Sequence, residues 1–145
     1  ESDLVITSIQ SCERLISSPL IRCRQLADAI STVFGVAVEI DDRVREMDFG
    51  KWEGQRWADI AESEVALWAE DFLHARPHGG ESVAMLRART QAALSDYCAG
   101  DRQTVIVTHS GVIKAALADG DTAEHFDTKI EFGGIIRPTH TGLSQ

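Results

Sequence analysis

The order of apolar and polar positions along the chain predicts strands that alternate with helices. Residues 13–19 (ERLISSP) form a short apolar run that stops at Ser-Pro, and residues 36–40 (VAVEI) form another. Residues 104–108 (TVIVT) are rich in β-branched side chains. All three runs have the length and composition of strands. The apolar core of the third is typical of the middle of a parallel sheet.

Apolar residues with helical spacing follow the first predicted strand. Ser18 is a suitable N-cap residue, Pro19 suits the first helical position, and Gly35 is a typical C-terminal stop. We therefore expect a helix over residues 20–34. Its buried face is predicted to carry Cys23, Leu26, Ala27, Ile30, Val33 and Phe34.

The rest of the chain continues the alternation. Helices are predicted over residues 58–74, over residues 83–98 with Ser82 as the N-cap, and from about residue 112. Polar loops with glycines separate them at residues 41–57 and 75–82, and residues 128–138 predict one or two further strands. The expected inward-facing residues of the helix after Ser82 are Val83, Leu86, Ala93, Leu94 and Tyr97. This order predicts one α/β domain over residues 1–145 with a mostly parallel sheet.

The composition of the chain limits the kinds of partner that it can bind. The chain has 145 residues and a formal net charge of −9, which argues against a nucleic-acid partner and against an anionic membrane surface. No apolar run approaches the ~18 residues of a membrane span. The three cysteines lack metal-binding spacing, so we expect reduced thiols and a cytoplasmic location, with no metal and no other cofactor. A small phosphorylated substrate stays compatible with the charge.

Two polar residues lie where α/β proteins bind ligands, outside the carboxyl ends of strands. His109 follows the strand at residues 104–108, and Arg22 lies in the first turn of a predicted helix, where backbone N–H groups favour anions. Taken alone, a histidine or arginine at such a position is more often structural or solvent-exposed than functional.

Four motifs together resemble the histidine phosphatase superfamily, the phosphoglycerate mutase-like proteins. They are SSPLIRCRQLADAI from Ser17, VREMDFGKWEG from Val44, PHGGES from Pro77 and VIVTHSGVIKAAL from Val105, in the family's order. The amino acids within these motifs are most similar to those of the α-ribazole phosphatases and related small-metabolite phosphatases. The resemblance implies a three-layer α/β/α sandwich in which residues 14–18 and 104–108 are neighbouring interior strands, with a further strand between or beside them.

The resemblance also implies roles for individual residues. Arg22 matches a phosphate-gripping arginine, His109 a catalytic histidine that stabilises the transferring phosphoryl group, and Glu46 the proton donor to the leaving oxygen. Glu81 matches a supporting or substrate-facing glutamate. Ser110 and Trp52 are further candidates for substrate binding, although the three tryptophans are as readily explained as packing residues.

One family feature is missing from these 145 residues. The family's nucleophile is the histidine of an R-H-G motif on the first strand, and none of His74, His78, His109, His125 and His140 follows an arginine. Ser2 onward matches the segment that comes next in the family. We expect the nucleophile, its strand and a final C-terminal element to lie outside these residues, because a sheet without its central strand leaves backbone groups unpaired. A truncation that lacks them is the alternative.

The resulting prediction is a metal-independent phosphomonoesterase that hydrolyses a small phosphorylated metabolite, such as α-ribazole phosphate, through a phosphohistidine. Two alternatives remain: a mutase that moves phosphate within one metabolite, and a non-catalytic protein that binds phosphorylated ligands or a protein partner. The compact segment after the W-E-G loop favours the phosphatase over the mutase. The chain is expected to be a monomer or a homodimer.

Overall fold

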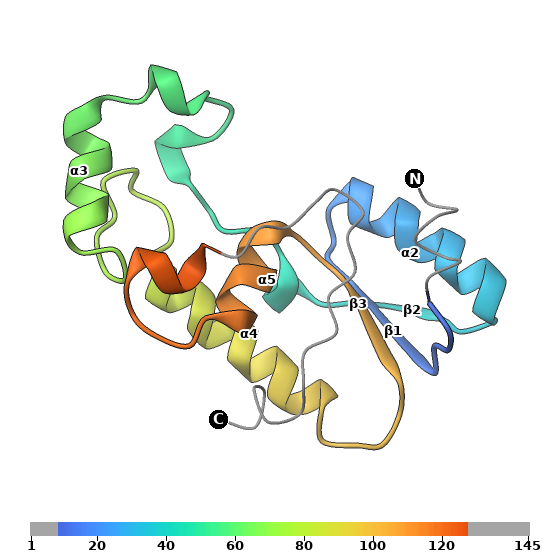
Figure 1. The fold of residues 1–145 in the computed structure, drawn as a ribbon. Coiled ribbons are helices and arrows are strands. Elements are labelled where there is room, and N and C mark those ends of the chain that lie inside the picture. Colours follow the sequence, from blue (N-terminus) through green and yellow to red (C-terminus); the bar gives the residue numbers. More distant parts are fainter. Residues whose placement is uncertain (1–8, 128–145) are drawn as a thin grey trace.

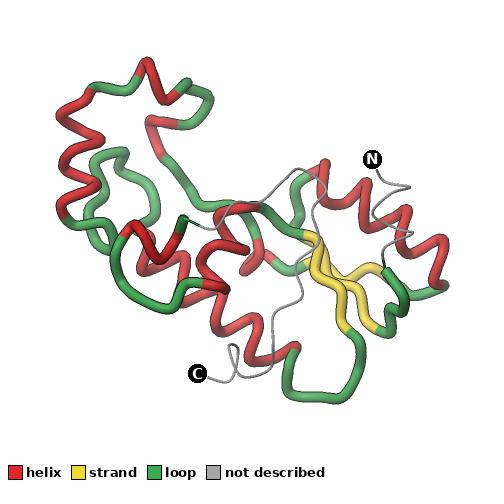
Figure 2. The backbone as a smooth tube through the Cα atoms, in the orientation of Figure 1, coloured by secondary structure: helices red, strands yellow, loops and turns green. Residues whose placement is uncertain are grey.

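The computed structural model describes residues 9–127, and its centre is a small parallel sheet. Strands β1 (Arg14–Ser17), β2 (Val38–Ile40) and β3 (Thr104–Val107) lie in the order β2-β1-β3, and both pairings are parallel. Figure 2 shows the three strands side by side. The predicted neighbours are therefore confirmed. Because β1 and β3 are directly hydrogen-bonded, no strand lies between them. A further strand beside them stays a prediction.

The two faces of β1 contact different helices, as alternating strand side chains require. Leu15 packs with buried residues of helix α2 (Ile21–Phe34), whereas Ile16 packs with buried residues of α4 (Val83–Tyr97) and α5 (Ser110–Leu117). Figure 1 shows α2 on one side of the sheet and α4 and α5 on the other. Among the described strands, β1 is the interior one. β3 is an outer, half-buried strand, contrary to the interior place expected from its apolar sequence.

Helix α2 matches its prediction in length but differs at its first turn. It begins at Ile21, with Leu20 as an N-cap residue that offers no side-chain cap, so Ser18 is not the N-cap. Gly35 ends the helix at φ 70°, a left-handed conformation that glycine adopts without strain. Cys23, Ala27 and Ile30 are buried as expected. Val33 is exposed, because it lies on the side of the helix that faces away from the sheet.

The later helices are close to expectation, with one exception. Ser82 does cap α4, since its hydroxyl accepts a hydrogen bond from the Met85 N–H at 3.1 Å. The predicted helix over residues 58–74 is instead a short 3-10 turn, η3 (Trp57–Asp59), followed by α3 (Glu62–Glu70). The backbone of Ile60 is extended between the two, where its side chain is buried. The strands predicted over residues 128–138 lie outside the described residues.

The remaining 3-10 turns are η1 (Asp42–Val44), η2 (Gly50–Trp52) and η4 (Ala123–Phe126). Turn η1 is fixed at its start by Asp41, whose carboxylate accepts hydrogen bonds from Arg43 and from the Tyr97 hydroxyl. The Arg43 guanidinium, together with Tyr97, lowers the pKa of Asp41 to about 2 despite the opposing effect of burial. Burial and the Asp41 hydrogen bond raise the pKa of Tyr97 to about 12. This contact ties the start of the loop that carries Glu46 to helix α4.

Two glycine-containing loops, residues 48–51 and 78–81, meet backbone against backbone. The Glu81 N–H donates to the Asp48 carbonyl at 2.8 Å, and the Lys51 N–H donates to the His78 carbonyl at 2.9 Å. A Cβ atom on Gly80 would collide with the Asp48 carbonyl and lie 2.7 Å from the Gly50 nitrogen. The glycines therefore permit the two loops to approach closely. A larger residue at these positions would push the loops apart.

This contact predicts a specific stability difference between two Gly-to-Ala substitutions. Gly80→Ala is expected to lower the free energy of unfolding by about 1–3 kcal/mol, because overpacking against rigid backbone is costly. Gly100→Ala is the matched control, since no atom lies within 4 Å of its added Cβ. Denaturant unfolding of both variants measures the difference. Equal stability of the two would show that the loops do not meet as described.

Candidate functional site

The pairing of β1 with β3 brings the residues after both strands to one edge of the sheet. Ser17 lies beside Val107, and the Ser18 N–H donates to the Val107 carbonyl at 2.9 Å. Ser18 and His109 therefore face one another, with 2.8 Å between the Ser18 Oγ and the His109 Nε2. The Ser18 Oγ also accepts the Leu20 N–H, at 3.3 Å. Ser18 thus lies two residues before the N-cap residue Leu20, and its hydroxyl bonds to His109 as well as to the Leu20 N–H.

His109 is half-buried at the N-cap position of α5. The Sγ of Cys23, a buried residue of α2, lies 3.5 Å from its Nε2. Burial lowers the pKa of His109 below its ordinary value of 6.5. The negative charge of Glu46 opposes this shift, and the positive charges of Arg22 and Arg89 add to it. The imidazole is therefore mostly neutral at pH 7.

Glu46 reaches the same edge from the loop after β2. Its carboxylate accepts the Met47 N–H at 2.9 Å and the Gly111 N–H at 3.3 Å, so it lies at the amino end of α5, where a negative charge is favoured. A Cβ atom on Gly111 would lie 3.1 Å from the Glu46 Cδ and collide with its Oε1. The glycine after Ser110 thus leaves room for the carboxylate.

Arg22 lies exposed in the first turn of α2, and its side chain forms no hydrogen bond or ion pair with any residue within 9–127. It directly precedes Cys23, whose Sγ lies 3.5 Å from the His109 Nε2, so the start of α2 lies at the same edge of the sheet. The positive charge of Arg22 also contributes to the lowered pKa of His109. The structure therefore brings Arg22, Glu46 and His109 together from three different segments. A cation, a carboxylate and an imidazole in this arrangement can bind an anion and move a proton next to it.

Glu81 is bound to Arg89, a residue that sequence reasoning missed. Arg89 donates from Nε and Nη2 to the two Glu81 carboxylate oxygens at 2.7 and 2.9 Å. It also donates to the backbone carbonyls of Arg43 at 2.7 Å and Glu46 at 3.3 Å. Arg89 thus connects α4 to the loop that carries Glu46. Its one sequence signal is a cation three residues after the buried Leu86, on the inward face of the helix.

The other two candidates for substrate binding, Ser110 and Trp52, differ in how accessible they are. Ser110 is the exposed first residue of α5, next to His109. Trp52 is only 4% exposed, and it packs against Trp68 and His78 at ring-centroid distances of 5.6 and 5.0 Å. A substrate has almost no surface of Trp52 to contact. The packing interpretation of this tryptophan is therefore the correct one in this structure.

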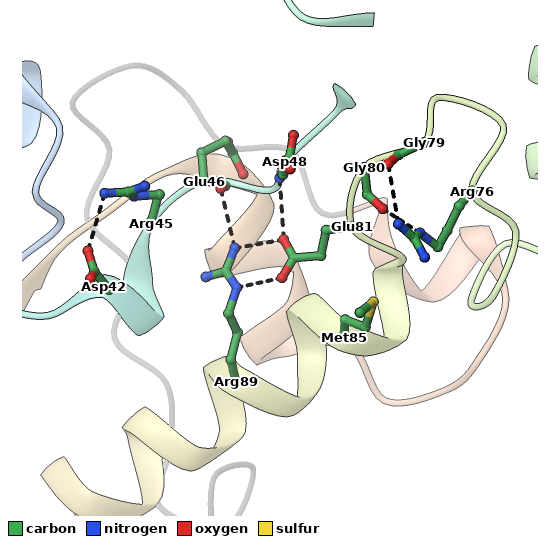
Figure 3. A pocket seen from close by; sticks show the side chains of 10 residues that line it. All are labelled: Asp42, Arg45, Glu46, Asp48, Arg76, Gly79, Gly80, Glu81, Met85 and Arg89. Carbon is green, nitrogen blue, oxygen red and sulfur yellow. Dashed lines mark hydrogen bonds and ion pairs between the residues drawn. The ribbon is translucent and has the colours of Figure 1, made fainter. Parts of the chain in front are cut away.

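A cavity of about 470 Å³ opens beside Glu46. We call it the charged cavity, because seven of its lining residues carry a charge. Figure 3 shows Arg45 and Arg76 at its two sides, with Glu46 and Asp48 between them. Its lining residues are Asp42, Arg45, Glu46, Asp48, Arg76, Gly79, Gly80, Glu81, Met85 and Arg89.

Two kinds of feature do not occur within residues 9–127. In this part of the chain, no group of three or more His, Cys, Asp and Glu side chains is arranged to hold a metal ion. None of the helices described above has the length and apolar character that crossing a membrane requires.

Comparison with known proteins points to one family. The sequence profile of the histidine phosphatase superfamily (branch 1) matches residues 6–130. A glucosyl-3-phosphoglycerate phosphatase of Mycobacterium tuberculosis is 33% identical over 117 residues, which are 72% of this chain and 52% of the relative. An adenosylcobalamin/α-ribazole phosphatase of Salmonella typhimurium is 28% identical over 111 residues, 73% of this chain and 55% of the relative. The chain thus spans about half the length of these curated relatives.

A solved structure agrees with the sequence matches. The complex of a mycobacterial glucosyl-3-phosphoglycerate phosphatase with inorganic phosphate superimposes with a TM-score of 0.71 at 29% identity. The match covers 86% of this chain and 67% of the other.

The charges around His109 predict opposite effects of two substitutions. Arg22→Gln removes a cation and should raise the pKa of His109, whereas Glu46→Gln removes an anion and should lower it further. NMR titration of the histidine ring signals measures both shifts. His78 serves as an internal reference, because burial, Asp48 and Arg76 set its pKa. An unchanged His109 titration in either variant would show that the replaced residue does not act on the ring.

Proposed function

Because the chain belongs to branch 1 of the histidine phosphatase superfamily, we propose that it forms part of a phosphomonoesterase that acts on a small phosphorylated metabolite. The observation that carries the proposal is the meeting of His109, Glu46 and Arg22 at one edge of the sheet. Hydrolysis of a phosphate ester needs these residue types. A cation and a ring N–H bind the phosphate oxygens, and an acid protonates the leaving oxygen.

The proposed reaction has two steps. A nitrogen of a histidine that lies outside residues 1–145 bonds to phosphorus while the ester P–O bond breaks, and Glu46 gives its proton to the leaving oxygen. Water then bonds to phosphorus as the N–P bond breaks, and Glu46 takes the proton that water loses. Arg22 and His109 hold the phosphoryl oxygens through both steps and offset the charge that develops on them. No metal ion takes part in this proposal.

The site residues have separate parts in this reaction. Arg22 has a guanidinium that can grip two phosphate oxygens at once. The lowered pKa of His109 keeps its ring neutral, so one ring nitrogen donates a hydrogen bond and the other accepts one. Ser110 is next to this ring and offers a further N–H and hydroxyl to the phosphate. Arg89 and Glu81 act as positioning residues, because Arg89 holds the backbone of Glu46.

Three small phosphorylated metabolites are candidates for the substrate of the proposed phosphatase. The names of the relatives indicate glucosyl-3-phosphoglycerate and α-ribazole phosphate, at 33% and 28% identity, and a third relative is named a putative phosphoserine phosphatase at 29%. All three names describe small phosphorylated metabolites. The residues of the four motifs favour α-ribazole phosphate, which is one of these three metabolites.

The proposed role of His109 gives the first activity test, on the complete protein that contains this chain. His109→Ala should lower turnover of a phosphomonoester by at least ~10²–10³-fold, because a preorganised donor to the transferring group is lost. Exposed His74 offers the matched control, and His74→Ala should retain activity. Activity should also persist in EDTA. Loss of activity in EDTA that a divalent ion restores would refute the metal-independent reaction.

The proposed role of Glu46 gives a second test. An alkyl phosphate releases an alkoxide that needs a proton, whereas a nitrophenolate leaves without much help. Glu46→Gln should therefore slow hydrolysis of an alkyl phosphate ~10²–10⁴-fold and largely spare the phosphoryl-transfer step with nitrophenyl phosphate. Exposed Glu62 provides the control variant Glu62→Gln. Equal losses on both substrates, together with a lower melting temperature, would instead make Glu46 a structural residue.

A further inference from the structure

Among the histidines within residues 9–127, His78 is the fully buried one, and its ring accepts a hydrogen bond. It is 2% exposed, whereas His74 and His125 are exposed and His109 is half-buried. The His78 Nδ1 accepts the Gly80 N–H at 2.9 Å. A ring nitrogen that accepts a hydrogen bond carries no proton, so this contact requires the neutral ring with its proton on Nε2.

The other nitrogen of the His78 ring lies in aromatic surroundings. Nε2 is buried and has no hydrogen-bond partner within residues 9–127. The ring packs against Trp52 and Phe49, at centroid distances of 5.0 and 6.0 Å. The face of an aromatic ring is a weak acceptor for an N–H group. A positive charge on His78 would therefore lack the hydrogen bonds that water gives it.

The charged groups near this ring act in opposite directions. Asp48 and Glu53 of the facing segment favour a protonated ring, whereas Arg76 of its own loop opposes it. On the side of α3, Glu64 is already paired with Lys51 at 2.6 Å, and the first turn of α4 has no acidic residue. Burial has the largest effect and lowers the pKa of the ring below its ordinary value of 6.5.

The hydrogen bond to Gly80 closes a turn over residues 78–80, which we call the His78 turn. The turn rests on the other glycine-containing loop, because the His78 carbonyl accepts the Lys51 N–H at 2.9 Å. A proton on Nδ1 would set two N–H groups against each other and put a charge among aromatic side chains, and both are costly. The turn therefore keeps this shape only while the ring is neutral.

The His78 turn is connected to Glu46 through the residue that follows it. The Glu81 N–H donates to the Asp48 carbonyl, and the Glu81 carboxylate accepts the Asp48 N–H at 3.3 Å. The same carboxylate binds Arg89, which donates to the Glu46 carbonyl at 3.3 Å. Figure 3 shows Glu81 between Asp48 and Arg89. Opening of the turn therefore removes support from the loop that carries Glu46.

We infer that His78 is a pH-dependent switch: its neutral ring keeps the His78 turn closed on residues 48–51, and protonation opens the turn and releases Glu46. Only the effect on activity rests on the proposed function, since the turn opens without a substrate. The open turn exposes the ring to water and binds the proton more tightly than the closed turn. Opening thus takes up a proton and becomes easier as the pH falls below the ordinary pKa of 6.5, and the closed turn has its full stability above it.

Amide hydrogen exchange in the complete protein that contains this chain measures the opening. Protection factors are compared, because they remove the intrinsic pH dependence of exchange. The protection of the Gly80, Glu81 and Lys51 amides should fall between about pH 7.5 and about pH 5, by at most about tenfold for each pH unit, since opening takes up one proton. Protection of these amides that does not change with pH overturns the inference.

Two variants separate the proton of the ring from its packing. His78→Asn keeps an acceptor in place of Nδ1 but takes up no proton, so its protection factors should not fall with pH. His74→Asn removes an exposed histidine of the same loop and should behave as the wild type. Equal falls in His78→Asn and the wild type overturn the inference. If His78→Asn does not fold, the NMR shifts of the wild-type ring nitrogens decide, and a proton on Nδ1 at neutral pH overturns the inference.

Turnover of an alkyl phosphate tests the release of Glu46. The ratio of wild-type to His78→Asn activity cancels the titration of His109 and of Glu46 itself. This ratio should be near one at about pH 7.5 and fall toward about pH 5, because only the wild-type turn opens. A ratio that does not change while the turn opens overturns the inference. If no phosphate ester is hydrolysed at any pH, the proposed function is wrong, and the exchange measurements alone decide whether His78 is a switch.

Discussion

The parallel hydrogen bonding between β1 and β3 is the constraint on which the site depends. It sets Ser17 beside Val107, so Ser18 and His109, which follow the ends of the two strands by one and two residues, come within hydrogen-bond distance although 91 positions separate them. A shift of register by one residue would turn every side chain of β3 to the opposite face. The buried side chains of Leu15 and Ile16 on opposite faces of β1 hold this register. The core of the sheet and the geometry around His109 are therefore fixed together.

Glu46 depends on a second set of contacts, because its loop has no regular structure of its own. The Thr108 hydroxyl donates to the Val44 carbonyl at 2.5 Å, which ties the start of the loop to the end of β3. Arg89 holds the Glu46 carbonyl from the side of α4, and Gly50 and Gly80 let the following residues pack against a second loop. Contacts with three elements thus replace the rigidity that a strand or helix would provide.

Sequence patterns predicted the features that rest on local chemistry. The strands, α2 with its end at Gly35, and the Ser82 cap all follow from short-range periodicity and capping rules. The places of Arg22 and His109 outside the carboxyl ends of strands were expected from the alternation of strands and helices. Glu46 was expected beside them only through resemblance to a family. The bond of the Ser18 hydroxyl to His109 was not predicted, because it joins residues 91 positions apart. Arg89 was missed for the same reason, since its partners on the loop are distant in sequence.

The contact between Gly111 and Glu46 has a consequence for how such a sequence can vary over evolution. A side chain at position 111 would occupy the space of the Glu46 carboxylate and push the acid away from the amino end of α5. The position of the Glu46 carboxylate at the amino end of α5 is therefore linked to a glycine in another motif, 65 positions later. Substitutions at the two positions should be correlated among related sequences. Relatives that carry a larger residue in place of Gly111 should be those that have moved or abandoned the acid.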